Sequence, residues 1–269
     1  MDKVRRSERL SIISKFLADR PGELISLNTF TDMFHSAKSS ISEDLAILRN
    51  TYIEYELGHI VTLPGVAGGV IYRPSLSDNQ AESLTARLCQ LIDQPERILP
   101  GGFLYLTDLI GDPLLMNEVG MFFARVFVDS DLDAVLTIET KGIPIAMMTA
   151  RILNLPLVIV RSDSRVSEGT SVGISYLSGT QRRLLTMSLP KRAIARGSRV
   201  LFIDDFMRGG GTAKGILDLM SEFDSQCVGM GFLVDVAGNV KLVSHYTALL
   251  SLQNIDPTER SLTITKGNW

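Results

Sequence analysis

The pattern of apolar and polar residues changes character near Pro74. Before this residue, apolar positions recur at helical spacing in short segments, and a glycine-rich stretch over residues 58–72 predicts two short strands around a turn. The predicted helices cover residues 7–17, 27–34 and 40–50. Three helices followed by a hairpin are the order of a winged helix-turn-helix, which we expect over residues 1–74.

After Pro74, apolar strands alternate with helical stretches. The alternating segments are residues 103–108, 113–127, 133–139, 143–154 and 156–161. Such alternation favours βαβ units, so we expect an α/β domain with a mainly parallel sheet over residues 75–269. The turn-forming residues 75–79 (SLSDN) are the predicted boundary between the two domains.

The third predicted helix has one apolar and one polar face. The segment 40–43 (SISE) has the pattern of a capping box and predicts the start of the helix. The apolar stripe consists of Ile41, Leu45, Leu48 and Tyr52, and the opposite face of Ser39, Ser42, Ala46 and Arg49. Small hydrogen-bonding side chains at the N-terminal end of this face, preceded by Lys38, suit a helix whose first turn enters the major groove of DNA.

Charge favours DNA binding only locally. The net charge of the whole chain is −3, which gives no sign of nucleic-acid binding, but five of the first fifteen side chains are basic and only two are acidic. The predicted DNA-contacting residues are Arg5, Arg6, Lys38, Ser39, Ser40, Ser42 and Arg49. The basic residues Lys3 and Arg9 add to the charge of this region. A winged helix that docks protein remains an alternative, because Glu43 and Asp44 would repel phosphates.

The segment 200–212 (VLFIDDFMRGGGT) carries the clearest chemistry in the chain. Four apolar residues predict a buried strand with Asp204 and Asp205 at its carboxyl end, where ligands bind in open α/β sheets. The glycines that follow let backbone amides and a helix N-terminus converge on a phosphate, and Thr212 can donate its hydroxyl. Two carboxylates beside a phosphate need donating partners or a metal, and ribose hydroxyls with Mg²⁺ nearby satisfy both demands. Paired aspartates also occur in Mg²⁺-dependent receiver and phosphatase sites, which stay open as alternatives.

This segment resembles the signature of the phosphoribosyltransferases, and the segment 139–144 (ETKGIP) resembles the pyrophosphate-binding loop of that family. The resemblance implies that the acidic pair holds the ribose hydroxyls of phosphoribosyl pyrophosphate (PRPP), that Gly209 through Thr212 hold its 5′-phosphate, and that Thr140 through Gly142 hold its pyrophosphate. Residues 161–188 resemble the mobile loop that covers the ligand in that family. The residues expected to bind PRPP are Thr140, Lys141, Gly142, Asp204, Asp205, Phe206, Met207, Arg208, Gly209, Gly210, Gly211 and Thr212.

The chain departs from the enzymes of this family in the residues after the acidic pair. Those enzymes carry small residues and a threonine there, whereas this chain carries the segment 206–209 (FMRG). The sequence also contains no separate insertion that would form a hood over a purine base. We therefore predict that the protein binds PRPP in a Mg²⁺-dependent manner and is not an enzyme.

A fusion of a winged helix to a phosphoribosyltransferase-like domain resembles, over nearly the whole chain, the purine operon regulator family of Gram-positive bacteria. The similar strings are residues 37–45 (AKSSISEDL), 140–144 (TKGIP), 167–179 (SEGTSVGISYLSG), 186–192 (TMSLPKR) and 203–212 (IDDFMRGGGT). The resemblance implies a homodimeric repressor of purine biosynthesis genes that PRPP releases from double-stranded operator DNA, with an activator role in some members. An active purine phosphoribosyltransferase and a regulator that senses another nucleotide remain alternatives.

The remaining sequence features give no competing site. Cys89 and Cys227 lie far apart in apolar stretches, and we expect two buried thiols in a reducing compartment. His35, His59 and His245 are too scattered to suggest a metal site, and no ligand set for a bound metal is predicted. No apolar run approaches the ~18 residues that span a bilayer, and the N-terminus is unlike a signal peptide, so we expect a cytoplasmic protein without membrane contact.

Overall fold

A computed structural model describes residues 4–65, 68–162, 169–177 and 184–269 of the chain. The chain divides into two compact units, Met1–Asn79 with Arg151–Asn154, and Gln80–Ala150 with Leu155–Trp269. The main division between Asn79 and Gln80 lies at the end of the segment in which the sequence places the domain boundary. None of the described helices is long and apolar enough to cross a membrane.

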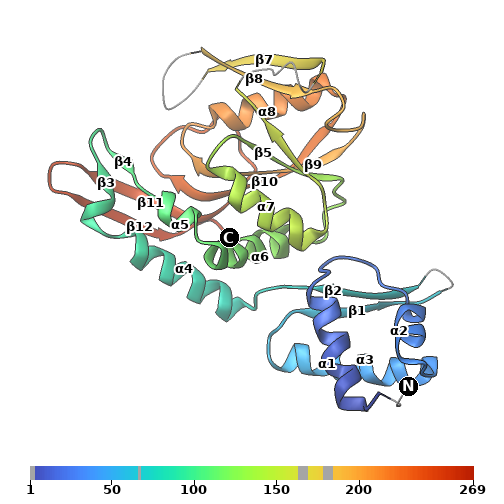
Figure 1. Cartoon of the computed structure of the whole chain (residues 1–269). Helices are drawn as coiled ribbons and strands as arrows, with labels where there is room; N and C mark the ends of the chain where they lie inside the picture. The colour runs from blue at the N-terminus through green and yellow to red at the C-terminus, as the bar shows by residue number, and fades with distance from the viewer. Residues whose placement is uncertain (1–3, 66–67, 163–168, 178–183) are drawn as a thin grey trace. The chain divides into compact units, whose positions relative to one another are not determined.

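The N-terminal unit has the predicted order of three helices and a hairpin (Figure 1). Its elements are α1 (Arg6–Ala18), α2 (Leu27–Phe34), α3 (Lys38–Glu54), β1 (His59–Leu63) and β2 (Gly69–Arg73). The two strands pair antiparallel from His59 opposite Arg73 to Leu63 opposite Gly69. The winged helix-turn-helix predicted from the sequence is therefore confirmed.

The predicted apolar stripe of α3 forms the centre of this unit. Ile41, Leu45, Leu48 and Tyr52 are all buried, in one cluster with Ile13, Leu17 and Phe30. The Tyr52 hydroxyl lies 2.7 Å from the Ser14 Oγ, which satisfies its polar end. The stripe thus packs α3 against α1 and α2, and leaves its polar face in solvent.

The predicted start of α3 is wrong by two residues. The helix begins at Lys38, its N-cap is Ala37 without a side-chain hydrogen bond, and the Ser42 Oγ donates to the Lys38 carbonyl at 2.9 Å. α2 ends in the left-handed residue His35 (φ 47°), so only a short turn connects the two helices. Ser40 and Ser42 therefore lie inside the helix, where a serine hydroxyl turns to the carbonyl four residues earlier instead of capping the helix.

The second unit is built on a six-stranded sheet (Figure 1). Its strands are β5 (Ala134–Ile138), β6 (Leu157–Val160), β9 (Arg199–Met207), β10 (Gln226–Val236), β11 (Thr247–Asp256) and β12 (Ser261–Lys266), in the order β12-β11-β10-β9-β5-β6. All neighbouring strands are parallel except β11 and β12, which are antiparallel. This result confirms the predicted α/β fold with a mainly parallel sheet.

Helices connect the parallel strands, as the alternating pattern predicts. The helices of this unit and the segment that leads into it are α4 (Asp78–Ile92), the 3₁₀ helix η1 (Pro95–Arg97), α5 (Thr107–Ile110), α6 (Pro113–Phe127), α7 (Gly142–Leu153) and α8 (Gly211–Glu222). Ile216 and Leu219 of α8 are fully buried in one cluster with Phe202 of β9 and Phe232 of β10. This packing fixes the start of α8 at the carboxyl end of β9.

Residues 103–108 do not form the predicted strand of the parallel sheet. Only Phe103–Leu104 is extended (β4), and it pairs with Ile98–Leu99 (β3) in a hairpin of its own. Gly101 and Gly102 both have positive φ, of 83° and 73°, which lets the chain reverse tightly between the two strands. The backbone of β4 pairs with β3 and not with the parallel sheet, and α5 begins soon afterwards at Thr107.

The described part of the segment 161–188 includes a second hairpin. β7 (Ser171–Leu177) pairs antiparallel with β8 (Leu184–Pro190), whereas residues 163–168 and 178–183 lie outside the described residues. A Cβ on Gly215 of α8 would come within 3.0 Å of the Tyr176 Cβ, so a glycine is needed where α8 approaches β7.

The two cysteines differ from the expectation of buried thiols. Cys89 and Cys227 are free, and each is only partly buried. Burial raises the pKa of Cys89 and raises the pKa of Cys227 to about 11, so both thiols stay protonated at neutral pH.

Candidate functional site

The loop between β9 and α8 has the form of an anion-binding turn. β9 extends through the acidic pair to Met207, because Asp204 still pairs with Phe232 of β10. α8 then begins at Gly211, and its N-cap Gly210 has φ 81°, a conformation that favours glycine. Amides in the first turn of a helix have no acceptor within the helix and attract anions, as does the helix dipole.

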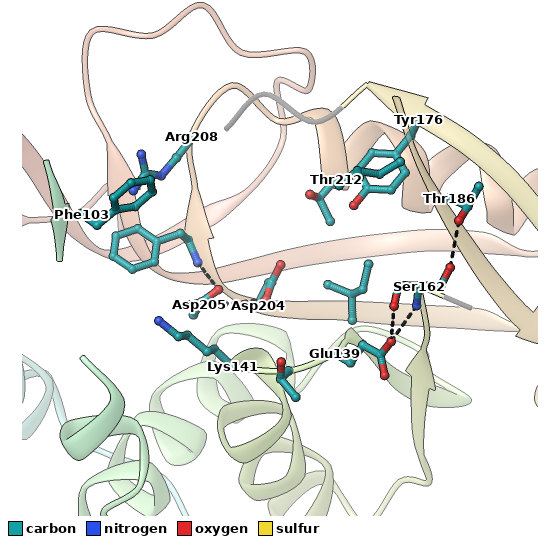
Figure 2. A pocket seen from close by; sticks show the side chains of 14 residues that line it. Phe103, Glu139, Lys141, Ser162, Tyr176, Thr186, Asp204, Asp205, Arg208 and Thr212 are labelled. Carbon is teal, nitrogen blue, oxygen red and sulfur yellow. Dashed lines mark hydrogen bonds between the residues drawn. The ribbon is translucent and has the colours of Figure 1, made fainter. Parts of the chain in front are cut away.

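A cavity of about 630 Å³ lies beside this loop (Figure 2). Its lining residues are Phe103, Ile138, Glu139, Thr140, Lys141, Ser162, Tyr176, Leu185, Thr186, Asp204, Asp205, Phe206, Arg208 and Thr212. A smaller hollow of about 160 Å³ lies over the glycines and is lined by residues 204–213 and Phe232. The structure therefore brings the expected pyrophosphate loop, the acidic pair and the glycine-rich loop to one place.

Two of the predicted site residues are placed differently from the rest. The Met207 side chain is 1% exposed and packs in the hydrophobic core, where its terminal methyl group lies beneath Gly210 of the loop. Gly142 lines neither cavity, but a Cβ on it would lie 2.6 Å from the Asp204 Oδ1 and 2.5 Å from the Thr137 Oγ1. Gly142 therefore lets the first turn of α7 approach the acidic pair closely.

The acidic pair lies in an environment that disfavours its charge. Burial raises the pKa of Asp204 well above its ordinary value, and the neighbouring Asp205 raises it further. Burial also raises the pKa of Asp205, although a hydrogen bond with Asp204 and the charge of Lys141 act against this rise. The backbone amides of Asp205 and Phe206 donate to the pair at 2.9 and 3.0 Å. Two adjacent, desolvated carboxylates with few donors would gain most from hydroxyl groups or a divalent cation.

These residues fit PRPP with Mg²⁺. Among the described residues there is no cluster of three or more His, Cys, Asp or Glu that could hold a metal alone. Mg²⁺ is usually bound through one or two carboxylates together with the phosphates of its ligand, which matches an isolated acidic pair. The ion would neutralise phosphate charge beside Asp204 and Asp205.

Phe103 lines the cavity although the sequence pattern does not predict it. It comes from β4, and the guanidinium of Arg208 lies 5.4 Å from the centre of its ring and 5.6 Å from that of Phe206 (Figure 2). These distances are typical of cation–π contacts. The hairpin β3–β4 thus gives the cavity an aromatic wall, although the sequence shows no separate insertion. The pair Gly101-Gly102 was the available signal for this hairpin.

Glu139 organises the other end of the cavity. Its Oε1 accepts hydrogen bonds from the amide and the hydroxyl of Ser162 at 2.8 and 2.6 Å (Figure 2). Its Oε2 lies 3.6 Å from the Arg161 guanidinium, and the Thr186 hydroxyl donates to the Ser162 carbonyl at 2.9 Å. The expected pyrophosphate loop is therefore tied to the end of β6 and to β8.

The predicted DNA-contacting residues lie on the surface of the N-terminal unit. Arg5, Arg6, Lys38, Ser39, Ser42 and Arg49 are exposed, and Ser40 is partly exposed. No ion pair joins Lys38 or Arg49 to another described residue. Both cations therefore remain available for phosphates.

The basic N-terminus is partly neutralised inside the domain, which the sequence pattern does not predict. Asp44 is fully buried and accepts from Arg6 Nε at 2.9 Å and Arg9 Nε at 2.8 Å, and Arg6 also approaches Glu43 at 3.4 Å. Arg9 is itself only 8% exposed, so it cannot serve as a surface charge for DNA. The same pairing removes the Asp44 carboxylate from the polar face, and with it part of the objection to DNA binding.

Comparison with protein families matches both units. The model described as "Bacterial purine repressor, N-terminal" matches residues 5–74, and the model "Phosphoribosyl transferase domain" matches residues 113–259.

Relatives match over the whole chain. The purine biosynthesis transcriptional repressor PurR of Bacillus subtilis is 47% identical over 99% of this chain and 94% of its own length. The purine biosynthesis transcriptional activator PurR of Lactococcus lactis is 37% identical over 98% of both chains. Among solved structures, an adenine phosphoribosyltransferase from Rhodothermus marinus aligns with a TM-score of 0.54 at 24% identity, covering 63% of this chain and 99% of that chain. That similarity shows the fold of the second unit, and together the matches show that this chain belongs to the PurR family of purine biosynthesis transcriptional regulators.

Proposed function

We propose that this protein represses purine biosynthesis genes by binding operator DNA through its winged helix, and that PRPP bound at the β9–α8 site releases it. The proposal is carried by one observation above the others: a DNA-binding domain of the purine repressor type and an intact phosphate loop beside an acidic pair occur in a single chain. The greater identity with the repressor than with the activator favours repression. We also propose that the protein is a homodimer and that it acts in the cytoplasm, where operators are found.

Each part of PRPP has a matching group in the cavity. The amides at the start of α8 suit the 5′-phosphate, and Asp204 with Asp205 suits the ribose hydroxyls as acceptors. Thr140 and Lys141, which line the cavity just before α7, suit the pyrophosphate, whose charge Lys141 and Mg²⁺ would balance. A ligand with a ribose phosphate but without the pyrophosphate would use only part of this set.

The proposed site binds PRPP without turning it over. Transfer of a phosphoribosyl group requires a base held in line with the departing pyrophosphate, and such alignment can be worth several kcal/mol of the barrier. Arg208, packed against Phe103 and Phe206, stands in the loop where the enzymes of the fold carry small residues. A phosphoribosyltransferase with an accessory domain is the second candidate, which the fold of the second unit favours.

Two assays test the proposal. Fluorescence anisotropy of a labelled promoter fragment from a purine biosynthesis gene should show tight binding that PRPP with Mg²⁺ weakens, while an unrelated fragment binds weakly in both conditions. Unchanged operator affinity in the presence of PRPP would refute the effector role. Incubation with labelled purine bases, PRPP and Mg²⁺ should give no nucleotide, and turnover at ~1 s⁻¹ or faster would identify an enzyme instead.

A further inference from the structure

The carbonyl groups of the loop between β9 and α8 are held by donors on neighbouring segments. The Lys241 Nζ donates to the carbonyl oxygens of Met207 at 3.3 Å and Arg208 at 2.7 Å. The amide of Leu242 donates to the Gly209 carbonyl at 3.0 Å, and the amide of Lys214 to the Gly210 carbonyl at 2.8 Å. The carbonyl of one residue and the amide of the next share a planar trans peptide and point in opposite directions, so these bonds also fix the loop amides.

The amides fixed in this way remain open to a ligand. Among the backbone hydrogen bonds between described residues outside the regular elements, none is donated by Gly209 or Gly210. Gly211 is the first residue of α8, where the amide lacks an acceptor within the helix. All three glycines line the hollow of about 160 Å³.

The ammonium of Lys241 is built into the fold and does not reach into this hollow. It lies 2.5 Å from the Asp235 carboxylate and donates to the Val236 carbonyl at 2.7 Å, and both charged side chains are only 15% exposed. The Tyr246 hydroxyl donates to the same carboxylate at 3.2 Å. A lysine ammonium has three donors and no acceptor, so a largely buried one can donate hydrogen bonds to several carbonyl oxygens at once.

We infer that Lys241 is a positioning residue for phosphate binding: it presets the amides of the β9–α8 loop without touching the ligand. This inference rests on the proposed function, since it assigns the loop to the 5′-phosphate of PRPP. A residue with only a general role in stability would affect both ends of the ligand equally when it is replaced. Loss of Lys241 should weaken binding of the phosphate monoester end of the ligand, and should spare the pyrophosphate end, which would bind at the start of α7.

The test uses full-length protein and three variants. In Lys241→Met/Asp235→Asn the ammonium and its partner charge are removed together, so that no unpaired buried carboxylate remains. Lys241→Arg keeps the charge and part of the donor set, so it should fold even where the double variant does not. It should also lose affinity for the phosphate monoester end alone, but by less than the double variant. Lys214→Met is the matched control, because Lys214 lies in the first turn of α8, is half exposed and pairs only with the exposed Asp218 among the described ion pairs.

Calorimetric titration with ribose 5-phosphate and, separately, with inorganic pyrophosphate and Mg²⁺ gives the readout. The double variant should bind ribose 5-phosphate at least about tenfold more weakly, or ~1.4 kcal/mol, and should bind pyrophosphate as the wild type does. Lys214→Met should bind both within about twofold of the wild type, since one exposed charge is largely screened.

Three results would overturn the inference. Wild-type affinity of the folded Lys241 variants for ribose 5-phosphate, or an equal loss for both probes, would show that Lys241 does not position the loop. A wild-type protein that binds neither PRPP nor ribose 5-phosphate would instead refute the proposed function, and this inference with it.

Discussion

At the residue scale, the charged carboxylates of Asp204 and Asp205 lower the stability of the folded protein, because burial disfavours their charged form. Burial and mutual repulsion raise the pKa of Asp204, and burial raises the pKa of Asp205. Strongly perturbed carboxyl groups that line a cavity are typical of functional sites. Hydroxyl donors and Mg²⁺ would relieve what the fold alone leaves unfavourable.

The perturbed pair predicts a pH-dependent stability. A carboxyl group with a raised pKa in the folded state binds its proton more tightly there, so its contribution to stability is greatest at low pH and is lost as the pH rises through the folded pKa. Asp205→Asn should therefore raise the melting temperature at about pH 7, and the gain should shrink as the pH falls towards 3.8, the ordinary value for Asp. Scanning calorimetry of both proteins across this range measures the effect. A lower melting temperature for the variant at neutral pH would contradict this account of the pair.

The exposed cations of α3 predict a salt-dependent loss of DNA affinity. Lys38→Ala or Arg49→Ala should weaken operator binding without unfolding the protein, and each lost phosphate contact should flatten the slope of log K against log salt by ~0.9. Anisotropy titrations at several salt concentrations give the slope. Lys15→Ala is the control, because Lys15 is exposed on α1 and pairs with Asp19. Equal slopes for all four proteins would move the DNA-contacting surface away from α3.

At the element scale, α3 is held in place by a buried charge as well as by its apolar stripe. The sequence predicts the stripe correctly, because helical spacing depends only on neighbouring residues. The pairing of Asp44 with Arg6 and Arg9 joins residues more than thirty positions apart, and no local pattern predicts it. Asp44 therefore holds α3 against α1.

Breaking this connection should destabilise the winged helix. Asp44→Ala leaves Arg9 buried without its partner, and the expected loss is about 3–5 kcal/mol in the free energy of unfolding. Urea denaturation followed by circular dichroism measures it. Asp19→Ala, which breaks an exposed ion pair on α1, should leave the unfolding midpoint unchanged. A loss for Asp44→Ala no larger than that of the control would show that the pair contributes little.

The close approach of α7 to the acidic pair predicts the effect of adding one methyl group. In Gly142→Ala the new Cβ would collide with Asp204 and Thr137, so the start of α7 must shift and PRPP affinity should fall by at least about tenfold, or ~1.4 kcal/mol. Leu114→Ala on α6 is the control, since its side chain is 78% exposed and does not line the cavity. Calorimetric titration with PRPP and Mg²⁺ compares the two variants, and equal affinities would show that the approach is not needed for binding.

At the scale of the whole molecule, the two-part architecture follows from patterns that the sequence displays. Alternation of strand and helix predicts the parallel sheet, and three short helices before a hairpin predict the winged helix. The exceptions are contacts that only the fold creates: residues 103–108 turn back on β3 and carry Phe103 to the cavity, and Arg9 becomes buried. The acidic pair and the glycine-rich loop could be predicted as a candidate site because they are contiguous in sequence.

PRPP binding in the second unit and operator binding in the first are expected to be coupled. If PRPP reduces operator affinity, operator DNA must reduce PRPP affinity by the same factor, because coupling free energy is reciprocal. The acidic pair should carry this coupling through the effector alone, since it has no part in the winged helix.

The most direct measurement is the operator affinity of the wild type and of Asp204→Asn/Asp205→Asn, each with and without PRPP and Mg²⁺. We expect equal operator affinity for both proteins without PRPP, a weakening of at least about tenfold, or ~1.4 kcal/mol, when PRPP is added to the wild type, and no change when it is added to the variant. A variant that PRPP still releases from the operator, or a wild type that PRPP does not release, would contradict the proposed role of the acidic pair.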